Sequence, residues 1–186
     1  MSNNFVHLHT HSHYSLLDGM SKIPDLVKKA KDFGMPALAL TDHGVLYGAI
    51  EFYNECKKAE IKPIIGVEAY IAERSYLDKE SSLDTKRYHL TLLAKNNAGY
   101  KNLMKLVSIS HLDGYYYKPR MDLDLIEKHS QGLICLSGCP GSRFIQHLKS
   151  GNKEEATLLI KRYIKIFGKE NVFVEIMNHK EVDWYL

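Results

Sequence analysis

Histidine occupies every second position near the start of this chain, at His7, His9, His11 and His13 in the stretch HLHTHSHY. On a β-strand, residues two positions apart point to the same side and lie roughly 6–7 Å apart. His9 and His11 are therefore expected to face one side, where two imidazoles can reach one metal ion or two neighbouring ions. We expect His7 to hold a ligand through a hydrogen bond and His13 to lie in the loop that follows. The alternative is a polar run of hydrogen-bonded or solvated histidines.

Short apolar segments alternate with segments of helical periodicity along the chain. The periodicity predicts helices over 23–33, 48–59, 99–112 and 154–167. Strands are expected at 5–11, 37–41, 63–71, 89–94, 133–137 and 172–177. These strand segments are continuous buried runs more than alternating ones, which predicts an α/β fold with a parallel sheet and outer helices. At least six β/α units fit, and this number favours a barrel over an open sheet.

Length and composition describe an ordinary globular chain. Its 186 residues suit one domain with a substantial core. The formal net charge of +3 is too small to argue for nucleic-acid binding by itself. Cys56, Cys135 and Cys139 are too few and too unevenly spaced for a disulfide scaffold, so a reducing cytoplasm is the expected location. The polar start and the absence of a long apolar run predict no signal peptide and no membrane span.

Metal-binding side chains recur at successive predicted strands. In parallel α/β folds, the loops after the carboxyl ends of the strands build the functional site. His43 follows the second predicted strand, Glu68 lies within the third, His89 begins the fourth and Cys139 follows the fifth. Imidazole, carboxylate and thiolate are the donors that bind zinc and related transition metals. The pattern therefore predicts a metal site at one rim of the fold.

Taken singly, several of these residues have simpler explanations. A histidine at a strand end can be a hydrogen-bonded structural residue. Asp18, in front of Gly19, fits a plain turn, and Cys139 fits a small core residue. Glu68 is harder to explain in this way, because an unpaired acid between Val67 and Ala69 in a buried strand is costly.

Five ordered stretches carry a family resemblance. HLHTHSHYSLLDG, ALTDHG, PIIGVEAYIA, YHLTLLAKNNAGYKNL and GLICLSGC together resemble the PHP (polymerase and histidinol phosphatase) family. The resemblance covers nearly the whole chain, from Phe5 to about His179. TDHGVLYGAIEFY and SHLDGYYYKPR favour the branch attached to bacterial replicative DNA polymerases over the free phosphatases.

The resemblance implies a distorted (β/α)7 barrel that holds up to three divalent metal ions, zinc first, with manganese or iron as alternatives. It matches seven ligand positions to this chain: His9, His11, Asp18, His43, Glu68, His89 and Cys139. The first four are also expected to carry catalysis through the bound metals. The family's last two ligands, an Asp-x-His pair on the final strand, have no counterpart here. Residues 1–186 are therefore expected to be a PHP domain that lacks its last strand, without the polymerase domains.

The implied chemistry is metal-assisted hydrolysis of a phosphoester. In the polymerase branch this is a 3′-to-5′ exonuclease that proofreads the nascent strand. The expected partners are a DNA 3′ end, the remaining domains of the polymerase and other replisome subunits. Two alternatives stay open. The domain is a non-catalytic support for the polymerase, or the chain is a free phosphatase for small molecules.

Two residues are expected to contact substrate. The stretch GYYYKPR, 114–120, interleaves tyrosines with cations, as single-strand binders do. Arg120 is the expected phosphate contact, although a packed loop explains the tyrosines equally well. His179, after the sixth predicted strand, is expected near the rim of the site. The charged connection 73–87 fits either a flap over the site or a solvated loop.

Overall fold

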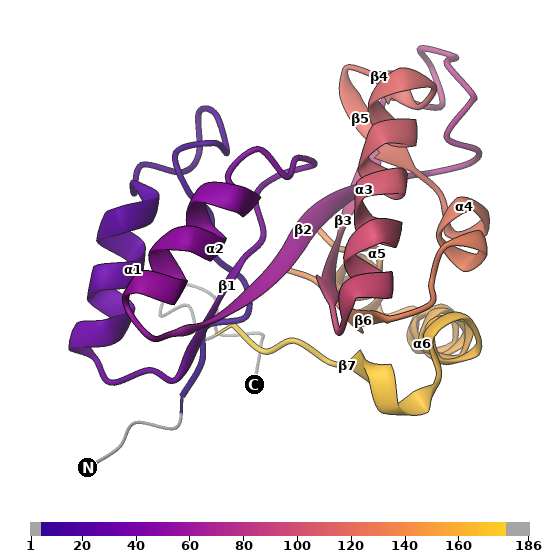
Figure 1. Cartoon of the computed structure of the whole chain (residues 1–186). Coiled ribbons are helices and arrows are strands. Elements are labelled where there is room, and N and C mark those ends of the chain that lie inside the picture. The colour runs from indigo at the N-terminus through magenta and orange to yellow at the C-terminus, as the bar shows by residue number, and fades with distance from the viewer. Residues whose placement is uncertain (1–4, 178–186) are drawn as a thin grey trace.

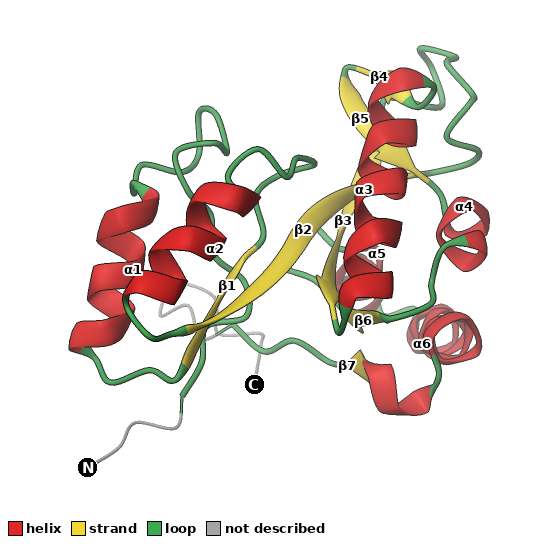
Figure 2. Ribbon diagram, viewed as in Figure 1, coloured by secondary structure: helices red, strands yellow, loops and turns green. Residues whose placement is uncertain are grey.

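The computed structural model describes residues 5–177, in which helices pack against a mixed seven-stranded sheet (Figures 1 and 2). The helices are α1 (Ile23–Asp32), α2 (Ala49–Lys58), α3 (Asn97–Leu112), α4 (Leu123–Lys128), α5 (Arg143–Lys149), α6 (Lys153–Phe167) and the 3-10 helix η1 (Lys169–Asn171). The strands are β1 (Ala37–Leu40), β2 (Lys62–Ala72), β3 (Arg87–Ala94), β4 (Tyr115–Tyr116), β5 (Lys118–Met121), β6 (Leu133–Leu136) and β7 (Val172–Phe173). The four helices expected from periodicity are present, each within two residues of its expected ends. None of the helices in this part of the chain is long and apolar enough to cross a membrane.

Strand β2 connects the two halves of the molecule. Its first residues pair in parallel with β1, from Ala37↔Lys62 to Leu40↔Ile65. Its later residues pair with β3 on one side and with β5 on the other. In Figure 1, β2 runs from the part that contains α1, α2 and β1 into the part that contains α3. Each half has its own core, so residues in the middle of β2 lie where the two cores meet.

The α/β class is confirmed, but the expectation that all strands are parallel is wrong at the β4–β5 hairpin, which is antiparallel, and at β3. This strand runs antiparallel to β2 and to β6, whereas β1–β2, β2–β5 and β6–β7 are parallel. A parallel return usually requires a helical crossover. The connection 73–86 contains no helix and closes directly onto the pair Ala72↔Arg87, so the chain turns back on itself. Within residues 5–177 the strand order runs from β4 to β7 without closing into a barrel.

The histidine-rich segment lies beside β1 but is not a regular strand. The amide of Ala39 donates to the carbonyl of His7, and the amide of Thr41 donates to the carbonyl of Thr10, both at 2.9 Å. Between these two bonds the segment advances three residues while β1 advances two. One extra residue interrupts a ladder as a β-bulge does, which explains why the predicted strand at 5–11 is absent.

Candidate metal centre

Glu68 of β2 lies at the centre of four imidazoles. Its side chain is 2% exposed. One carboxylate oxygen, Oε1, is 3.3 Å from His9 Nε2 and 2.9 Å from His89 Nδ1. The other, Oε2, is 3.3 Å from His11 Nε2 and 2.7 Å from His43 Nδ1. One buried acid on β2 therefore joins the histidine-rich segment, the residue after β1 and β3.

Three parts of the chain position the four imidazoles. His9 and His11 come from the extended segment beside β1, and their rings are 5.1 Å apart. His43 follows β1 and forms an isolated parallel bridge with Glu68. His89 lies on β3, in register with Tyr70 of β2. The sheet and the segment beside it therefore bring these imidazoles to Glu68.

The remaining two predicted ligands complete the cluster. The Cys139 thiol, after β6, donates to Glu68 Oε1 at 3.1 Å. Asp18 Oδ2 is 2.7 Å from His43 Nε2 on the solvent side, where the Asp18 side chain is 56% exposed. Gly19 allows this turn, because a Cβ there would lie 1.9 Å from the Ser12 carbonyl oxygen. All seven side chains predicted as ligands thus meet at one place, while their role as ligands stays a prediction.

Several donor atoms in the cluster face a shared space. Glu68 Oε2 and His43 Nδ1 are buried, and neither makes a hydrogen bond of acceptable geometry, although they are 2.7 Å apart. Three overlapping groups each have ligand atoms within 4.8 Å of one another: His9, His11 and Glu68; His11, Asp18 and His43; and His43, Glu68 and His89. Buried polar atoms without partners are rare in proteins. A cation among these atoms would satisfy them, so the residues fit a divalent metal site.

Glu68, His9 and Cys139 have shifted pKa values. Burial opposes ionisation of Glu68, but the four imidazoles within 3.3 Å outweigh it and hold the pKa of this carboxyl well below its usual range. Burial also opposes the charge on His9, but hydrogen bonds to Glu175 and Glu68 raise its pKa from 6.5 to about 9. Burial and the nearby Glu68 carboxylate raise the pKa of Cys139 to about 12. Without a cation, the proton on His9 helps to balance the buried Glu68 carboxylate.

These shifts predict how pH affects the stability gained from a metal. The His9 pKa is raised on folding, so in metal-free protein its proton stabilises the fold fully below pH 6.5 and this stabilisation is lost as pH rises through about 9. Metal binding needs neutral imidazoles, so metal affinity rises over the same interval. We expect the gain in Tm from added Zn²⁺ to increase between pH 6.5 and pH 9 in thermal unfolding. A gain that stays constant or shrinks over this interval would contradict the proton–metal exchange.

The chain matches a known protein family. The family model described as "PHP domain" matches residues 7–179. The chain belongs to the PHP domain family. It is 53% identical, over 94% of its length, to DNA polymerase III subunit alpha of Borreliella burgdorferi, and 48% identical, over 95% of its length, to the same subunit of Treponema pallidum. The chain spans 15% of the length of each of these relatives. A solved amidohydrolase structure from Chromobacterium violaceum matches 59% of this chain and 34% of its own, with a TM-score of 0.43 and 24% identity.

Glu175 is a further acid at this PHP domain site, and it is not one of the seven ligands predicted from the sequence. Its Oε1 is 2.6 Å from His9 Nδ1, and its side chain is 10% exposed. Its amide donates to Ser137 Oγ at 2.9 Å, which fixes the backbone after β7 beside β6. The signal was present in the stretch VFVEIM, where an acid interrupts an apolar run as Glu68 does. Glu175 therefore orients one imidazole of the candidate metal centre.

The expectation that His7 holds a ligand through a hydrogen bond is wrong. His7 is exposed, and its ring packs against Phe5 at 4.8 Å, away from the cluster. Instead, two hydroxyl groups contact ring nitrogens of His9 and His11. Thr91 Oγ1 is 3.3 Å from His9 Nδ1, and Ser15 Oγ is 3.1 Å from His11 Nδ1. Contacts of this kind orient metal-binding imidazoles.

The expectation that Arg120 contacts a phosphate is also wrong. Arg120 is 0% exposed. Its guanidinium donates to four backbone carbonyls, those of Gly114, Tyr76, Asp78 and Asp84. These bonds attach β5 to the connection 73–86, so this segment is a compact loop and Arg120 is a structural residue. His179, the other expected substrate contact, lies outside the described residues.

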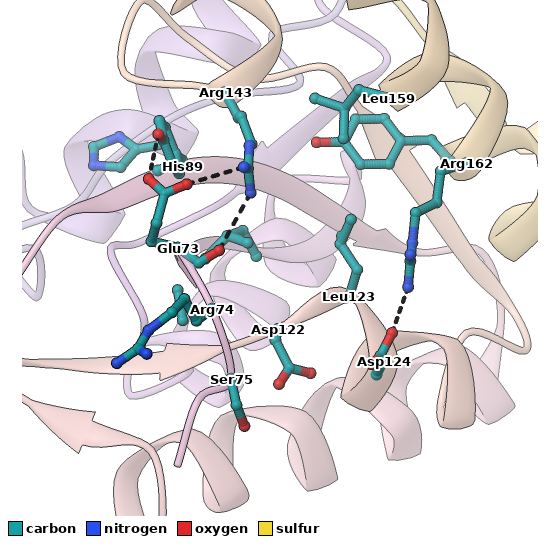
Figure 3. A pocket seen from close by; sticks show the side chains of 14 residues that line it. Glu73, Arg74, Ser75, His89, Asp122, Leu123, Asp124, Arg143, Leu159 and Arg162 are labelled. Carbon is teal, nitrogen blue, oxygen red and sulfur yellow. Dashed lines mark hydrogen bonds and ion pairs between the residues drawn. The ribbon is translucent and has the colours of Figure 1, made fainter. Parts of the chain in front are cut away.

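A cavity of about 250 Å³ lies beside the PHP domain's candidate metal centre and includes His89 in its lining (Figure 3). Three arginines line it, and each is paired with a carboxylate. Arg74 Nη2 is 2.7 Å from Asp84 Oδ2, Arg143 Nη2 is 2.9 Å from Glu73 Oε1, and Arg162 pairs with Asp124. Because all three cations are already paired, the described lining of this cavity offers no free cation for an anion.

Proposed function

We propose that this chain is the PHP domain of a bacterial replicative DNA polymerase III alpha subunit and a metal-dependent phosphoesterase that removes nucleotides from DNA 3′ ends. The observation that carries the proposal is the buried Glu68 carboxylate, surrounded by four imidazoles and the Cys139 thiol. The relatives support the polymerase context, because the chain matches about half of their residues over this segment. The remaining polymerase domains, other replisome subunits and a DNA 3′ end are the proposed partners, in the cytoplasm.

The donor set indicates which ions fit and which residues would hold them. Nitrogen, oxygen and sulfur donors together favour Zn²⁺, with Mn²⁺ or Fe²⁺ as alternatives. His9, His11 and Glu68 would hold one position, and His43 with Asp18 would hold the solvent side. Divalent ions held there acidify a water molecule and stabilise the leaving oxygen of a phosphoester.

The chain's own residues define where substrate enters. Asp18 is the most exposed of the seven candidate ligands, whereas Glu68 is almost fully buried. A phosphate therefore approaches from the side of the turn that carries Asp18. Asp42 keeps this turn in place, since its buried carboxylate accepts hydrogen bonds from the amide and hydroxyl of Ser12 and from the Ser15 hydroxyl.

Metal analysis together with a nuclease assay tests the proposal. Purified protein should retain divalent metal after dialysis and should shorten single-stranded and mismatched primers from the 3′ end. His9→Ala should lower the rate about 100-fold, because it removes a ligand that contacts both Glu68 and Glu175. His129→Ala is the matched control, since His129 ends α4 away from the cluster, and its activity should equal that of the unaltered protein.

Two results would contradict the proposed exonuclease activity. Bound metal with no turnover on any DNA end would support the structural-module alternative. Faster turnover of a sugar phosphate than of DNA would support a small-molecule phosphatase. Circular dichroism of His9→Ala separates lost catalysis from lost folding.

A further inference from the structure

We propose that four aromatic side chains beside the metal centre hold the unpaired nucleotides of a single-stranded DNA end. We call them the aromatic platform: Tyr47, His111 and Tyr115, whose rings meet at His111, and Tyr117 at the tip of the same hairpin as Tyr115. The proposal deepens the proposed function and rests on it, because it names the form of DNA that reaches the metal centre. It assigns a binding role to the tyrosine-rich stretch 114–120, which the candidate metal centre does not use.

The aromatic platform begins next to His43 of the metal centre. Gly44, directly after His43, accepts a hydrogen bond through its carbonyl oxygen from His111 Nε2 at 2.9 Å. The centroid of the His111 ring is 6.5 Å from that of Tyr47 and 6.5 Å from that of Tyr115. A fixed imidazole therefore lies between two tyrosine rings, one from the loop before α2 and one from β4.

A second series of contacts joins the same hairpin to the metal centre. The Tyr70 ring stacks on His43 at 5.9 Å between centroids. Lys118 Nζ lies 5.6 Å from the centroid of the Tyr70 ring. Lys118 begins β5, which pairs with β4 as Tyr116↔Lys118. The β4–β5 hairpin is thus held beside the metal centre by contacts independent of His111, and Figure 1 shows this hairpin at the carboxyl end of α3.

The tyrosines of the aromatic platform are exposed in a way that core packing does not explain. Tyr47, Tyr115 and Tyr117 are 66%, 53% and 63% exposed. Tyr117 lies at the tip of the hairpin with φ of +60°, a left-handed conformation that favours glycine. A bulky residue in this conformation is strained, and such strain is typical of functional positions. The Tyr117 ring packs edge-on against the Tyr116 ring, with centroids 4.7 Å apart, but stays 63% exposed, so burial recovers little of this cost.

Charge favours a nucleic-acid strand as the occupant. Proteins that bind single strands without sequence preference combine aromatic rings, which stack on bases, with cations for the phosphates. Lys118 is exposed within the hairpin. Helix α3, whose last turn carries His111, exposes Lys101 and Lys105 towards its start and middle and contains no acidic residue, and the exposed Asp113 caps its end. A duplex keeps its base faces stacked inside, so this surface fits unpaired nucleotides.

Fluorescence anisotropy with a short labelled oligodeoxythymidylate tests the proposal on the full chain. The measurement is made in EDTA, so binding is observed whether or not the metal centre is catalytic. Tyr115→Ala and Tyr117→Ala should each weaken binding about tenfold, whereas Tyr117→Phe should bind like the unaltered protein because it keeps the ring. Phe33→Ala is the matched control, since Phe33 is 52% exposed at the end of α1, far from the hairpin, and it should bind unchanged.

A second variant separates binding from folding. Tyr117→Gly relieves the backbone strain, so it should lower affinity as Tyr117→Ala does without lowering Tm. Three results would overturn the proposal: no binding of the oligonucleotide by the unaltered protein, equal binding by the tyrosine variants, or equal binding of a blunt duplex. Binding in EDTA with no nuclease activity on metal reloading would contradict the exonuclease and leave the aromatic platform supported.

Discussion

Glu68→Gln is expected to lose most of its affinity for metal while the chain stays folded. Glu68 contacts His9, His11, His43 and His89 within 3.3 Å. It is the only acid among the described residues that reaches all four. Glutamine has nearly the same shape but no charge, so the site loses the anionic donor shared by its imidazoles. Removing residues that only orient a ligand costs 10–100-fold, and we expect a loss of about 100-fold or more in metal affinity.

Metal stoichiometry after dialysis and competition with a chromogenic chelator measure this effect. Added Zn²⁺ should raise the Tm of the unaltered protein, because a ligand that binds only the folded state stabilises it, and should leave the Tm of Glu68→Gln unchanged. Glu73→Gln is the matched control. Glu73 lies five residues further along, where it pairs with Arg143 in the neighbouring cavity. Glu68→Gln with full metal content would show that the imidazoles bind without the acid at their centre.

The candidate site was predictable because polar residues interrupt apolar strands. His43, His89 and Cys139 each lie at or near the end of a buried run and Glu68 lies within one, where a polar side chain is costly unless it has a partner. The sheet brings such positions together, as the bridge between His43 and Glu68 shows. Glu175 carries the same signal and was not selected, since the short run around it predicted only a strand.

Strand direction and the role of Arg120 were not predictable from local pattern. A buried strand has the same apolar run in either direction, so the antiparallel course of β3 depends on how the connection 73–86 closes. Arg120 lies in a stretch that resembles a nucleic-acid contact. Three of its four acceptors, on Tyr76, Asp78 and Asp84, are 36 to 44 residues away in the sequence. Spacing along the chain carries no information about partners at this separation.

Arg120→Ala is expected to be among the most destabilising single substitutions in this chain. The guanidinium is fully buried and donates to the carbonyls of Gly114, Tyr76, Asp78 and Asp84 at 2.7 to 3.2 Å. Removing one partner from a buried hydrogen bond costs about 1–3 kcal/mol for each group left unsatisfied. Because water can reach some of these carbonyls once the side chain is gone, we expect a total loss of about 3–5 kcal/mol.

Urea unfolding followed by circular dichroism measures this loss directly. Arg87→Ala is the matched control, because the Arg87 side chain is only half-buried and donates to one nearby carbonyl, that of Thr85. Its free energy of unfolding should change by less than about 1 kcal/mol. Arg120→Lys should keep only part of the stability, since an ammonium group cannot reach carbonyls in the planar arrangement that the guanidinium serves. If Arg120→Ala instead kept full stability and lost affinity for DNA, Arg120 would be the phosphate contact that its sequence context suggests, and the loop 73–86 would need another anchor.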